Sequence, residues 1–268
     1  IFLIRGYGRW KTGIASLGNW VRLVNWLSVF IIHFDIGVFL DLKNFSGIII
    51  KKSENDFSED FSFPQCTINK IYFFNNNIYY AVGNNNLILR GFDQGSSWTA
   101  LTTKNNCNYY DVFFVDENIG YFVGSNTDEG FISITYDGCK TWTYKELPES
   151  KSLKAIYAIN KDSLIILGSG NKIYCTGDGC LNFNKVELGN DVNNNLYCIN
   201  KIDNNNLLFL ASHPVETEDK EIVYTSTSVY KLRVDNFFSE NFIKISPEKY
   251  KNELIANMQT AAENEASS

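Results

Sequence analysis

The sequence predicts an all-β fold, a β-propeller of four-stranded antiparallel blades, and three observations lead to this prediction. An eight-residue motif recurs at intervals of 44 and 41 residues, short apolar and aromatic runs precede each copy, and asparagine triplets separate these runs. Four short strands in a repeat of about 40 residues are typical of a propeller blade. The 268 residues therefore predict six or seven blades, of which the N-terminal blade is incomplete.

The repeated motif has an aspartate at its third position and an aromatic residue at its eighth. Its three clear copies are Gly91–Trp98 (GFDQGSSW), Thr135–Trp142 (TYDGCKTW) and Thr176–Phe183 (TGDGCLNF). Gly or Cys lies two residues after each aspartate, and Ser, Thr or Asn lies four residues after it. We expect structural roles for the matching residues, which are Asp93, Gly95, Ser97, Trp98, Asp137, Thr141, Trp142, Asp178, Asn182 and Phe183.

The strand signal is clearest upstream of the first copy. Apolar and aromatic runs alternate there with asparagine triplets, in the order Ile71–Phe74, Asn75–Asn77, Ile78–Val82, Asn84–Asn86 and Leu87–Arg90. Asparagine adopts positive φ more readily than most residues that have a Cβ atom, so we expect each triplet to form a hairpin turn. The triplet Asn204–Asn206 predicts the same turn in a later copy.

The chemistry of the motif predicts that its side chains close and stabilise a turn, a role that we call a lock. An aspartate that begins a tight turn can accept hydrogen bonds from backbone N–H groups that follow it, and the hydroxyl or amide four residues on can bond to it. The aromatic residue is expected to pack as a wedge against the neighbouring sheet, contributing about 2–3 kcal/mol. A calcium or catalytic site would need several acidic residues together, and each copy offers one. We therefore predict no catalytic, cofactor-binding or metal-binding residues.

The domain prediction follows the repeat. One propeller domain is expected over residues 1–246, and a tail over residues 247–268 forms either a short helix or a closing strand. If the tail supplies the missing inner strand of the first blade, the propeller has six blades; otherwise the chain is an open part of a seven-bladed one, which we favour. The expected blades are approximately 1–24 (partial), 25–63, 64–104, 105–148, 149–190 and 191–246.

Composition narrows the classes of partner and site. With a net charge of −6 and few arginines, the chain is a poor candidate for binding nucleic acid. The apolar run Leu23–Ile32 has about half the length that spanning a bilayer requires, so no transmembrane segment is expected. The six cysteines form no CxxC pair, and His33 and His213 are far apart, which argues against zinc. A disulfide between Cys175 and Cys180 remains an alternative to free, buried thiols.

The segment from Gly120 to Trp142 (GYFVGSNTDEGFISITYDGCKTW) carries a family resemblance. It resembles the Asp-box (BNR) repeat, in the form found in photosystem II stability/assembly factor-type propellers. The segment from Tyr80 to Trp98 has the same form, although Cys replaces the second Gly of the box in two of the three copies. The resemblance implies a non-catalytic propeller that binds a protein partner or serves as an assembly scaffold, and it slightly favours a secreted, periplasmic or organelle-lumen location. The compartment itself stays open.

Two other functions compete with the scaffold hypothesis. A sialidase-like glycosidase, or a carbohydrate-binding propeller, is the main alternative, and the propeller of a sortilin-type receptor is a weaker one. Sialidase chemistry needs three arginines that hold the substrate carboxylate. It would group Arg22, Arg90 and Arg233 on inner strands, whereas the simpler interpretation places these, like Arg5 and Arg9, on the solvated surface.

The remaining polar features have simple structural interpretations. His33 is expected to be a core residue and His213 a loop residue. The acidic insertion Ser212–Tyr224 is expected to be a solvated loop, with a cation-binding or partner-binding appendage as the alternative.

Overall fold

The structure is a computed structural model. It describes residues 27–33, 36–41, 46–52, 57–63, 66–103, 106–127, 129–147, 149–170, 172–187, 195–203, 206–216, 222–233 and 243–245. The expected first blade copy over 1–24 and the tail over 247–268 lie outside these residues.

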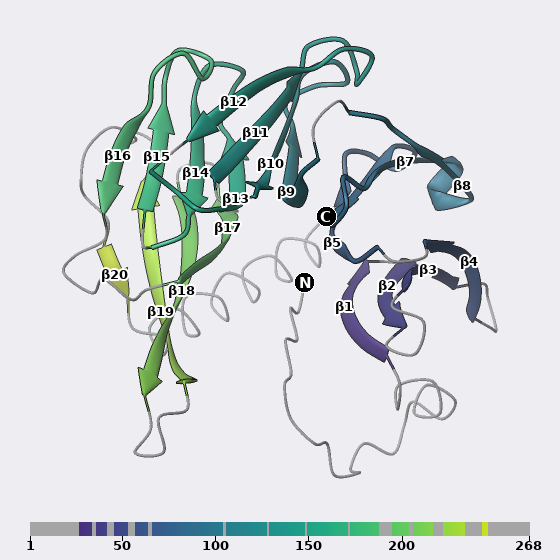
Figure 1. Cartoon of the computed structure of the whole chain (residues 1–268), viewed down its shortest axis with the longest axis horizontal. Coiled ribbons are helices and arrows are strands. Elements are labelled where there is room, and N and C mark those ends of the chain that lie inside the picture. Colours follow the sequence, from purple (N-terminus) through teal and green to yellow (C-terminus); the bar gives the residue numbers. More distant parts are fainter. Residues whose placement is uncertain are drawn as a thin grey trace, which may run out of the picture. The chain divides into compact units, whose positions relative to one another are not determined.

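Within the described residues the chain folds into antiparallel strands and one short 3₁₀ helix over Asp93–Gly95 (Figure 1). The strands form five sheets of four strands each, and in every sheet the strands follow the order of the chain. This arrangement confirms the predicted all-β fold with four-stranded antiparallel blades. The eroded copies of the repeat form sheets as well as the clear ones do.

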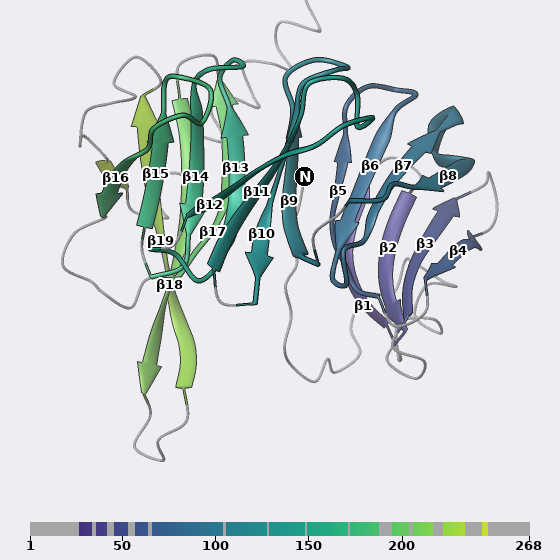
Figure 2. The ribbon, with the colours of Figure 1, turned by 45° about the horizontal axis from the view of Figure 1, so that its top comes forward.

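The chain divides into two compact units, Ile1–Glu146 and Leu147–Ser268. The first holds the sheets β1 (Leu27–His33), β2 (Ile36–Asp41), β3 (Ser46–Lys52), β4 (Phe57–Phe63); β5 (Ile68–Phe73), β6 (Tyr79–Gly83), β7 (Ile88–Phe92), β8 (Ser97–Ala100); and β9 (Asn108–Phe114), β10 (Gly120–Asn126), β11 (Glu129–Thr135), β12 (Thr143–Leu147). The second holds β13 (Leu153–Ala158), β14 (Leu164–Gly168), β15 (Lys172–Thr176), β16 (Asn184–Glu187); and β17 (Asn195–Asp203), β18 (Asn206–Glu216), β19 (Ile222–Arg233), β20 (Ile243–Ile245) (Figure 2).

Neighbouring sheets of one unit meet through their first strands. In the first unit β9 lies against β5 and β6, and β5 lies against β1 and β2. In the second unit β17 lies against β13 and β14. The first strand of each sheet is therefore its inner strand, as in a propeller blade, and the third and fourth strands lie further out.

Three of the hairpin turns between first and second strands are closed by the same kind of side-chain hydrogen bond. The Asn75 Oδ1 atom accepts hydrogen bonds from the backbone N–H groups of Asn77 and Ile78, both at 2.8 Å. Asp116 and Asn160 accept the equivalent pairs of bonds in the next two sheets. The turn between β6 and β7 instead places Asn85 and Asn86 at φ of 56° and 62°. Both triplets therefore form turns as predicted, and residues 204 and 205 of the third lie outside the described residues.

The core of the first unit is rich in aromatic residues. Phe114 of β9 stacks on Tyr80 of β6 with ring centroids 4.0 Å apart, and it meets Phe122 of β10 edge to face at 5.6 Å. All three side chains are buried, and burial of each contributes about 1.5–3 kcal/mol. These rings hold the sheet β5–β8 to the sheet β9–β12.

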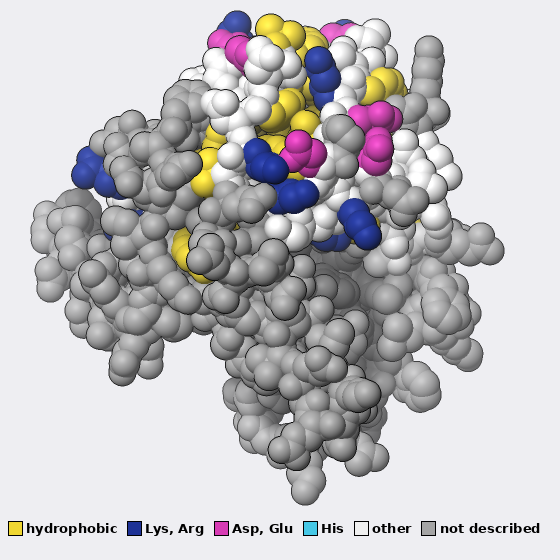
Figure 3. Space-filling view, turned by 60° about the vertical axis from the view of Figure 1, so that its left-hand side comes forward, with side chains coloured by type: hydrophobic (Ala, Val, Ile, Leu, Met, Phe, Trp, Pro, Cys, Tyr) yellow, Lys and Arg dark blue, Asp and Glu magenta, His cyan; other side chains and the backbone are white. Residues whose placement is uncertain are grey.

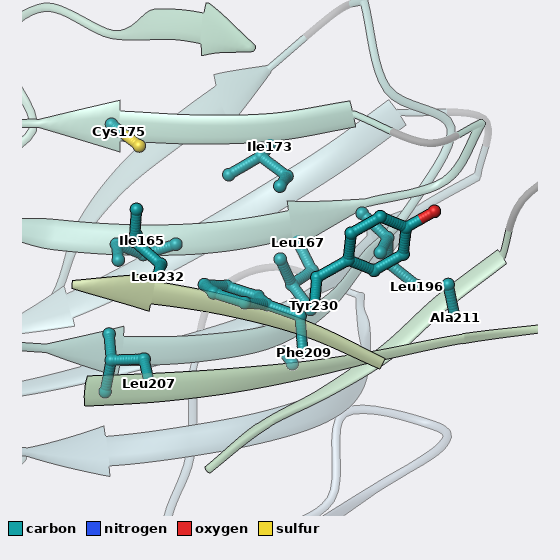
Figure 4. Close-up of a cluster of buried hydrophobic side chains, with 11 residues drawn as sticks. Ile165, Leu167, Ile173, Cys175, Leu196, Leu207, Phe209, Ala211, Tyr230 and Leu232 are labelled. Carbon is teal, nitrogen blue, oxygen red and sulfur yellow. The ribbon is translucent and has the colours of Figure 1, made fainter. Parts of the chain in front are cut away.

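The core of the second unit is mainly aliphatic (Figure 4). Its buried side chains come from both sheets, and they include Ile165, Leu167, Ile173, Cys175, Leu196, Leu207, Phe209, Ala211, Tyr230 and Leu232. This layer joins the sheet β13–β16 to the sheet β17–β20.

Candidate functional site

The aspartate of the second Asp-box accepts four hydrogen bonds from its own turn. Its Oδ1 atom accepts from the backbone N–H groups of Lys140 (3.0 Å) and Thr141 (2.8 Å) and from the Thr135 hydroxyl (3.0 Å). Its Oδ2 atom accepts from the Thr141 hydroxyl at 2.6 Å. These bonds, led by those from Thr141, lower the pKa of Asp137 to about 2. The carboxylate stays ionised at neutral pH and locks the turn.

The third Asp-box repeats this geometry with an amide in place of the hydroxyl. The Asp178 carboxylate accepts from the backbone N–H groups of Leu181 (3.0 Å) and Asn182 (2.9 Å), and from the Asn182 side chain at 2.7 Å. The Thr176 hydroxyl donates to it at 2.8 Å. The bonds from Asn182 are the main cause that lowers the pKa of Asp178 to about 2.

A threonine two residues before each of these aspartates completes the turn. The Thr135 hydroxyl accepts the backbone N–H of Cys139 at 2.8 Å, and the Thr176 hydroxyl accepts that of Cys180 at 3.2 Å. Cys139 and Cys180 have φ of 71° and 69°. Both threonines are the first residue of the motif. The sequence predicts no role for them, because Gly91 occupies that position in the first copy.

The first Asp-box differs from the expected lock. Asp93 begins a 3₁₀ helix with a φ of 52°, its N–H donates to the Asn77 side chain at 3.1 Å, and Trp98 Nε1 donates to the Gly95 carbonyl at 3.0 Å. Ser97 is exposed. A glycine at position 91 cannot supply the hydroxyl that organises the other two turns, so this copy closes by a different set of bonds.

The box aromatics contact their own sheets. Trp142 meets Phe122 of β10 edge to face at 5.1 Å, and Trp98 lies 6.5 Å from Tyr79 of β6. Phe183 is half-buried. Both ring contacts are with the second strand of the sheet to which the turn belongs, rather than with a neighbouring sheet as expected.

A β-bulge recurs in the inner strand of every described sheet. In each of these strands the register with the second strand skips a residue. Asn69, Tyr110, Lys154 and Tyr197 are skipped near the N-terminal end of their strands, and Phe30 is skipped in the middle of β1. β17 also skips Ile202. Bulges bend a strand and redirect its side chains, and they are common beside functional sites. This shared irregularity marks one end of the inner strands as the candidate site.

In the first unit this end carries a polar cluster, which we call the inner-strand polar end: Asn69, Lys70, Tyr110 and Asp111. The Asn69 amide donates to Asn84 Oδ1 (2.8 Å) and to the Tyr109 carbonyl (2.7 Å), which joins β5 to β9. Lys70 Nζ lies 3.4 Å from the buried Asp111 carboxylate. The Lys70 side chain is 35% exposed, so a charged group is held in place and still meets solvent.

Neighbouring turns fix the inner-strand polar end. The N–H groups of Asn85 and Asn86 donate to the Asn108 side chain (3.0 Å) and the Cys107 carbonyl (2.7 Å). The Tyr109 hydroxyl bonds to Ser133 inside the sheet at 2.8 Å. A rigid support of this kind suits binding, because the side chains lose little freedom when a ligand arrives.

The described arginines do not lie on inner strands. Arg90 is in β7 and packs its guanidinium over the rings of Phe92 (4.9 Å) and Tyr80 (5.7 Å). Arg233 is the exposed last residue of β19. Both strands are the third of their sheets, so the grouping on inner strands that a sialidase would need is not formed by these two. Arg5, Arg9 and Arg22 lie outside the described residues.

The predictions for His213 and for the acidic insertion were both wrong in part. His213 is not a loop residue: it lies in β18 and pairs with Ser226 of β19. Much of the acidic insertion is strand, because the β18–β19 pairing continues to Glu216 and Ile222. His33 ends β1, and its side chain lies outside the described part of the structure.

The cysteines are free thiols in this structure, Cys175 and Cys180 included. Burial raises the pKa of Cys107 to about 11 and those of Cys139 and Cys175 to about 12. Such thiols stay protonated at neutral pH and are poor nucleophiles.

The described residues form neither a metal-binding cluster nor a membrane-spanning helix. They contain no group of three or more His, Cys, Asp or Glu side chains that could hold a metal ion. They also contain no helix with the length and apolar character needed to cross a membrane. Among the described side chains on the face drawn in Figure 3, basic and acidic groups lie next to one another and form no patch of a single sign.

Comparison with known proteins finds one family model and several solved structures that are similar to this chain. The family model of the photosynthesis system II assembly factor YCF48 matches residues 94–215, just under half of the chain. No curated protein sequence matches the chain.

Two of the similar solved structures have TM-scores above 0.5 and support a shared fold. An ancestral GH74 enzyme matches with a TM-score of 0.58 and 12% identity, over 78% of this chain and 29% of the enzyme. YCF48 bound to a D1 peptide matches with a TM-score of 0.53 and 13% identity, over 84% of this chain and 70% of that one. YCF48 from Cyanidioschyzon merolae has a TM-score of 0.49 and 11% identity, over 69% and 66% of the two chains. The chain is thus a BNR-type β-propeller similar to the photosystem II assembly factor.

Proposed function

We propose that this chain is a non-catalytic β-propeller that binds a segment of a protein partner and acts as an assembly scaffold, in the manner of YCF48. The observation that carries the proposal is the match of the YCF48 family model to residues 94–215, which include the turns locked by Asp137 and Asp178. YCF48 itself has been solved with a D1 peptide bound. The same resemblance favours an organelle-lumen, secreted or periplasmic location.

The inner-strand polar end is the surface that we assign to the partner segment. It offers the partly exposed Lys70 side chain and the Tyr110 hydroxyl, which bonds to Ser125, with Asn69 and Asp111 tied into the scaffold behind them. An extended peptide presents carbonyl oxygens and, on some side chains, carboxylates, which suit an ammonium donor. Rigid inner strands with redirected side chains supply the orientation that such binding needs.

The glycosidase alternative has less support. Arg90 and Arg233 are held on third strands, and Arg90 stacks on two aromatic rings. The likeness to the GH74 enzyme supports the fold and carries no argument about chemistry.

The experiment is a titration of the whole chain with a fluorescently labelled D1 peptide, followed by anisotropy. We expect saturable binding that Lys70→Ala weakens about tenfold, because the change removes a positioned charge from the surface. Lys161→Ala is the matched control, since Lys161 forms an exposed ion pair with Asp162 in the turn between β13 and β14. It should leave the affinity unchanged.

Two results would contradict the proposal. One is the absence of binding by the unmodified chain, and the other is an equal effect of Lys70→Ala and Lys161→Ala. Hydrolysis of a fluorogenic sialoside that Arg90→Ala or Arg233→Ala abolishes would support the glycosidase alternative instead.

A further inference from the structure

The hairpin of β18 and β19 is longer than the rest of its sheet. Its pairing continues to Glu216 and Ile222, whereas β17 pairs with β18 only as far as Ser212 and β20 pairs with β19 from Val229. Figures 1 and 2 show both strands running beyond the other strands of the sheet. We call the extension, His213–Glu216 with Ile222–Ser228, the ribbon.

The two edges of the ribbon differ in their ability to accept another strand. No other described strand pairs with either edge. Pro214 lies on the β18 edge, where it has no N–H to donate. The opposite edge, Ile222–Ser228 (IVYTSTS), has no proline, lysine or arginine and is rich in residues that favour strands. Lysine and proline are the residues that usually protect an exposed edge, so the β19 edge lacks that protection.

The residues in sequence at the end of the ribbon are mainly acidic. Glu216 ends β18, and Glu218, Asp219 and Glu221 follow before β19 begins, with Lys220 as the one basic residue. This excess of negative charge attracts a basic segment and opposes an acidic one. It also disfavours a second copy of this chain, whose net charge is −6.

We propose that the β19 edge Ile222–Ser228 takes up an extended segment of a partner protein, rich in lysine or arginine, as an added β-strand. Backbone hydrogen bonds to this edge, which no other described strand occupies, would supply affinity, and the acidic residues would select the basic segment. The ribbon would be a second docking surface, separate from the inner-strand polar end, so the two surfaces can be tested independently.

A deletion that keeps the sheet tests this proposal. Ser212 and Thr227 are paired in the ladder, so replacing the residues between them with Asn-Gly creates a two-residue hairpin loop, for which this dipeptide is favoured. The pairings of β17 and β20 are left in place. A second variant, Glu216→Gln with Glu218→Gln, Asp219→Asn and Glu221→Gln, keeps the edge and removes the charge.

The probe is a labelled ten-residue peptide that alternates Lys with Val and Thr, matched with a peptide in which Glu replaces Lys. We expect the unmodified chain to bind the basic peptide and its Ile222–Ser228 amides to gain protection from hydrogen exchange. The deletion should abolish binding, and the charge variant should weaken it about tenfold and reduce its salt dependence.

Three outcomes would overturn the proposal. They are equal binding of both peptides, protection of amides elsewhere than in β19, and dimerisation of the unmodified chain through the ribbon with no peptide binding. If the deletion variant does not fold, as judged by circular dichroism, the charge variant and the exchange pattern decide the result.

Discussion

The Thr135 hydroxyl does two tasks that the carboxylate beside it cannot do alone. It donates to Asp137 at 3.0 Å and accepts the N–H of Cys139 at 2.8 Å. Cys139 lies at a φ of 71°, a conformation that is unfavourable for a residue with a Cβ atom. The hydroxyl therefore stabilises a strained turn and orients the carboxylate that caps it.

Replacing this hydroxyl should destabilise the protein. Thr135→Val keeps the shape of the fully buried side chain but leaves the Cys139 N–H without its acceptor, at a cost of about 1–3 kcal/mol. Urea unfolding measures the loss. Thr143→Val, at an exposed position of β12, is the control. An equal effect of the two changes would show that the Thr135 hydroxyl does not stabilise the turn.

The sequence predicts the structural role of the box aspartates but not that of the threonines. Comparison of the three copies identified Asp93, Asp137 and Asp178, because all three copies keep that residue. It could not assign the hydroxyl, since one copy has Gly91 at the position. The three copies predict three similar turns. The first copy, however, has Gly91 in place of the threonine whose hydroxyl organises the other two turns.

At the scale of the strand, one recurring pair has a steric explanation. The sequence shows an apolar residue followed by glycine at Val82–Gly83, Val123–Gly124 and Leu167–Gly168. Each glycine pairs with the residue just before the bulge of the inner strand. A Cβ atom at Gly83 or Gly124 would overlap the carbonyl oxygen of Thr67 or Asn108. The bulge brings backbone so close that only glycine fits.

Gly124→Ala should therefore cost about 3 kcal/mol or more, because the obstacle is backbone and cannot rotate away. Gly170→Ala is the matched control: Gly170 has a φ of 70° and no neighbouring atom within 4 Å of an added Cβ. Only backbone strain of about 1 kcal/mol is expected there. Thermal melts compare the two variants, and similar losses would mean that the bulge does not require glycine.

The bulges themselves could not be predicted from the sequence. The skipped residues include Phe30, Asn69, Tyr110 and Lys154, which share no side-chain chemistry. A bulge is a feature of register between two strands, and the alternation of apolar residues along one strand does not reveal it. The strands and turns were predictable because they depend on local pattern, whereas the candidate site depends on this pairing and was not.

At the scale of the whole molecule, the repeat distributes the same lock over separate parts of the chain. Asp137 lies in the unit Ile1–Glu146 and Asp178 in the unit Leu147–Ser268. The two carboxylates share no hydrogen-bond partner in the bonds described above. Their contributions to stability should therefore be independent.

Acid should weaken both locks over the same range of pH. The pKa of each carboxyl group falls from 3.8 to about 2 in the folded chain. A lowered folded-state pKa means that the stabilisation is complete above the unfolded value and is lost as the pH falls from about 4 to about 2. We expect the urea midpoint of the unmodified chain to fall across this interval.

Substitution of the two aspartates checks that assignment. Asp137→Asn and Asp178→Asn should each lower the urea midpoint at pH 7 and flatten its dependence on pH between 4 and 2, since the amide no longer titrates there. The double variant should lose the sum of the two single losses, because the sites are separate. Asp162→Asn, an exposed carboxylate paired with Lys161, should leave the slope near that of the unmodified chain. If the single variants kept the full slope, the acid sensitivity would have to come from other carboxylates, and the Asp-boxes would not be the locks of this propeller.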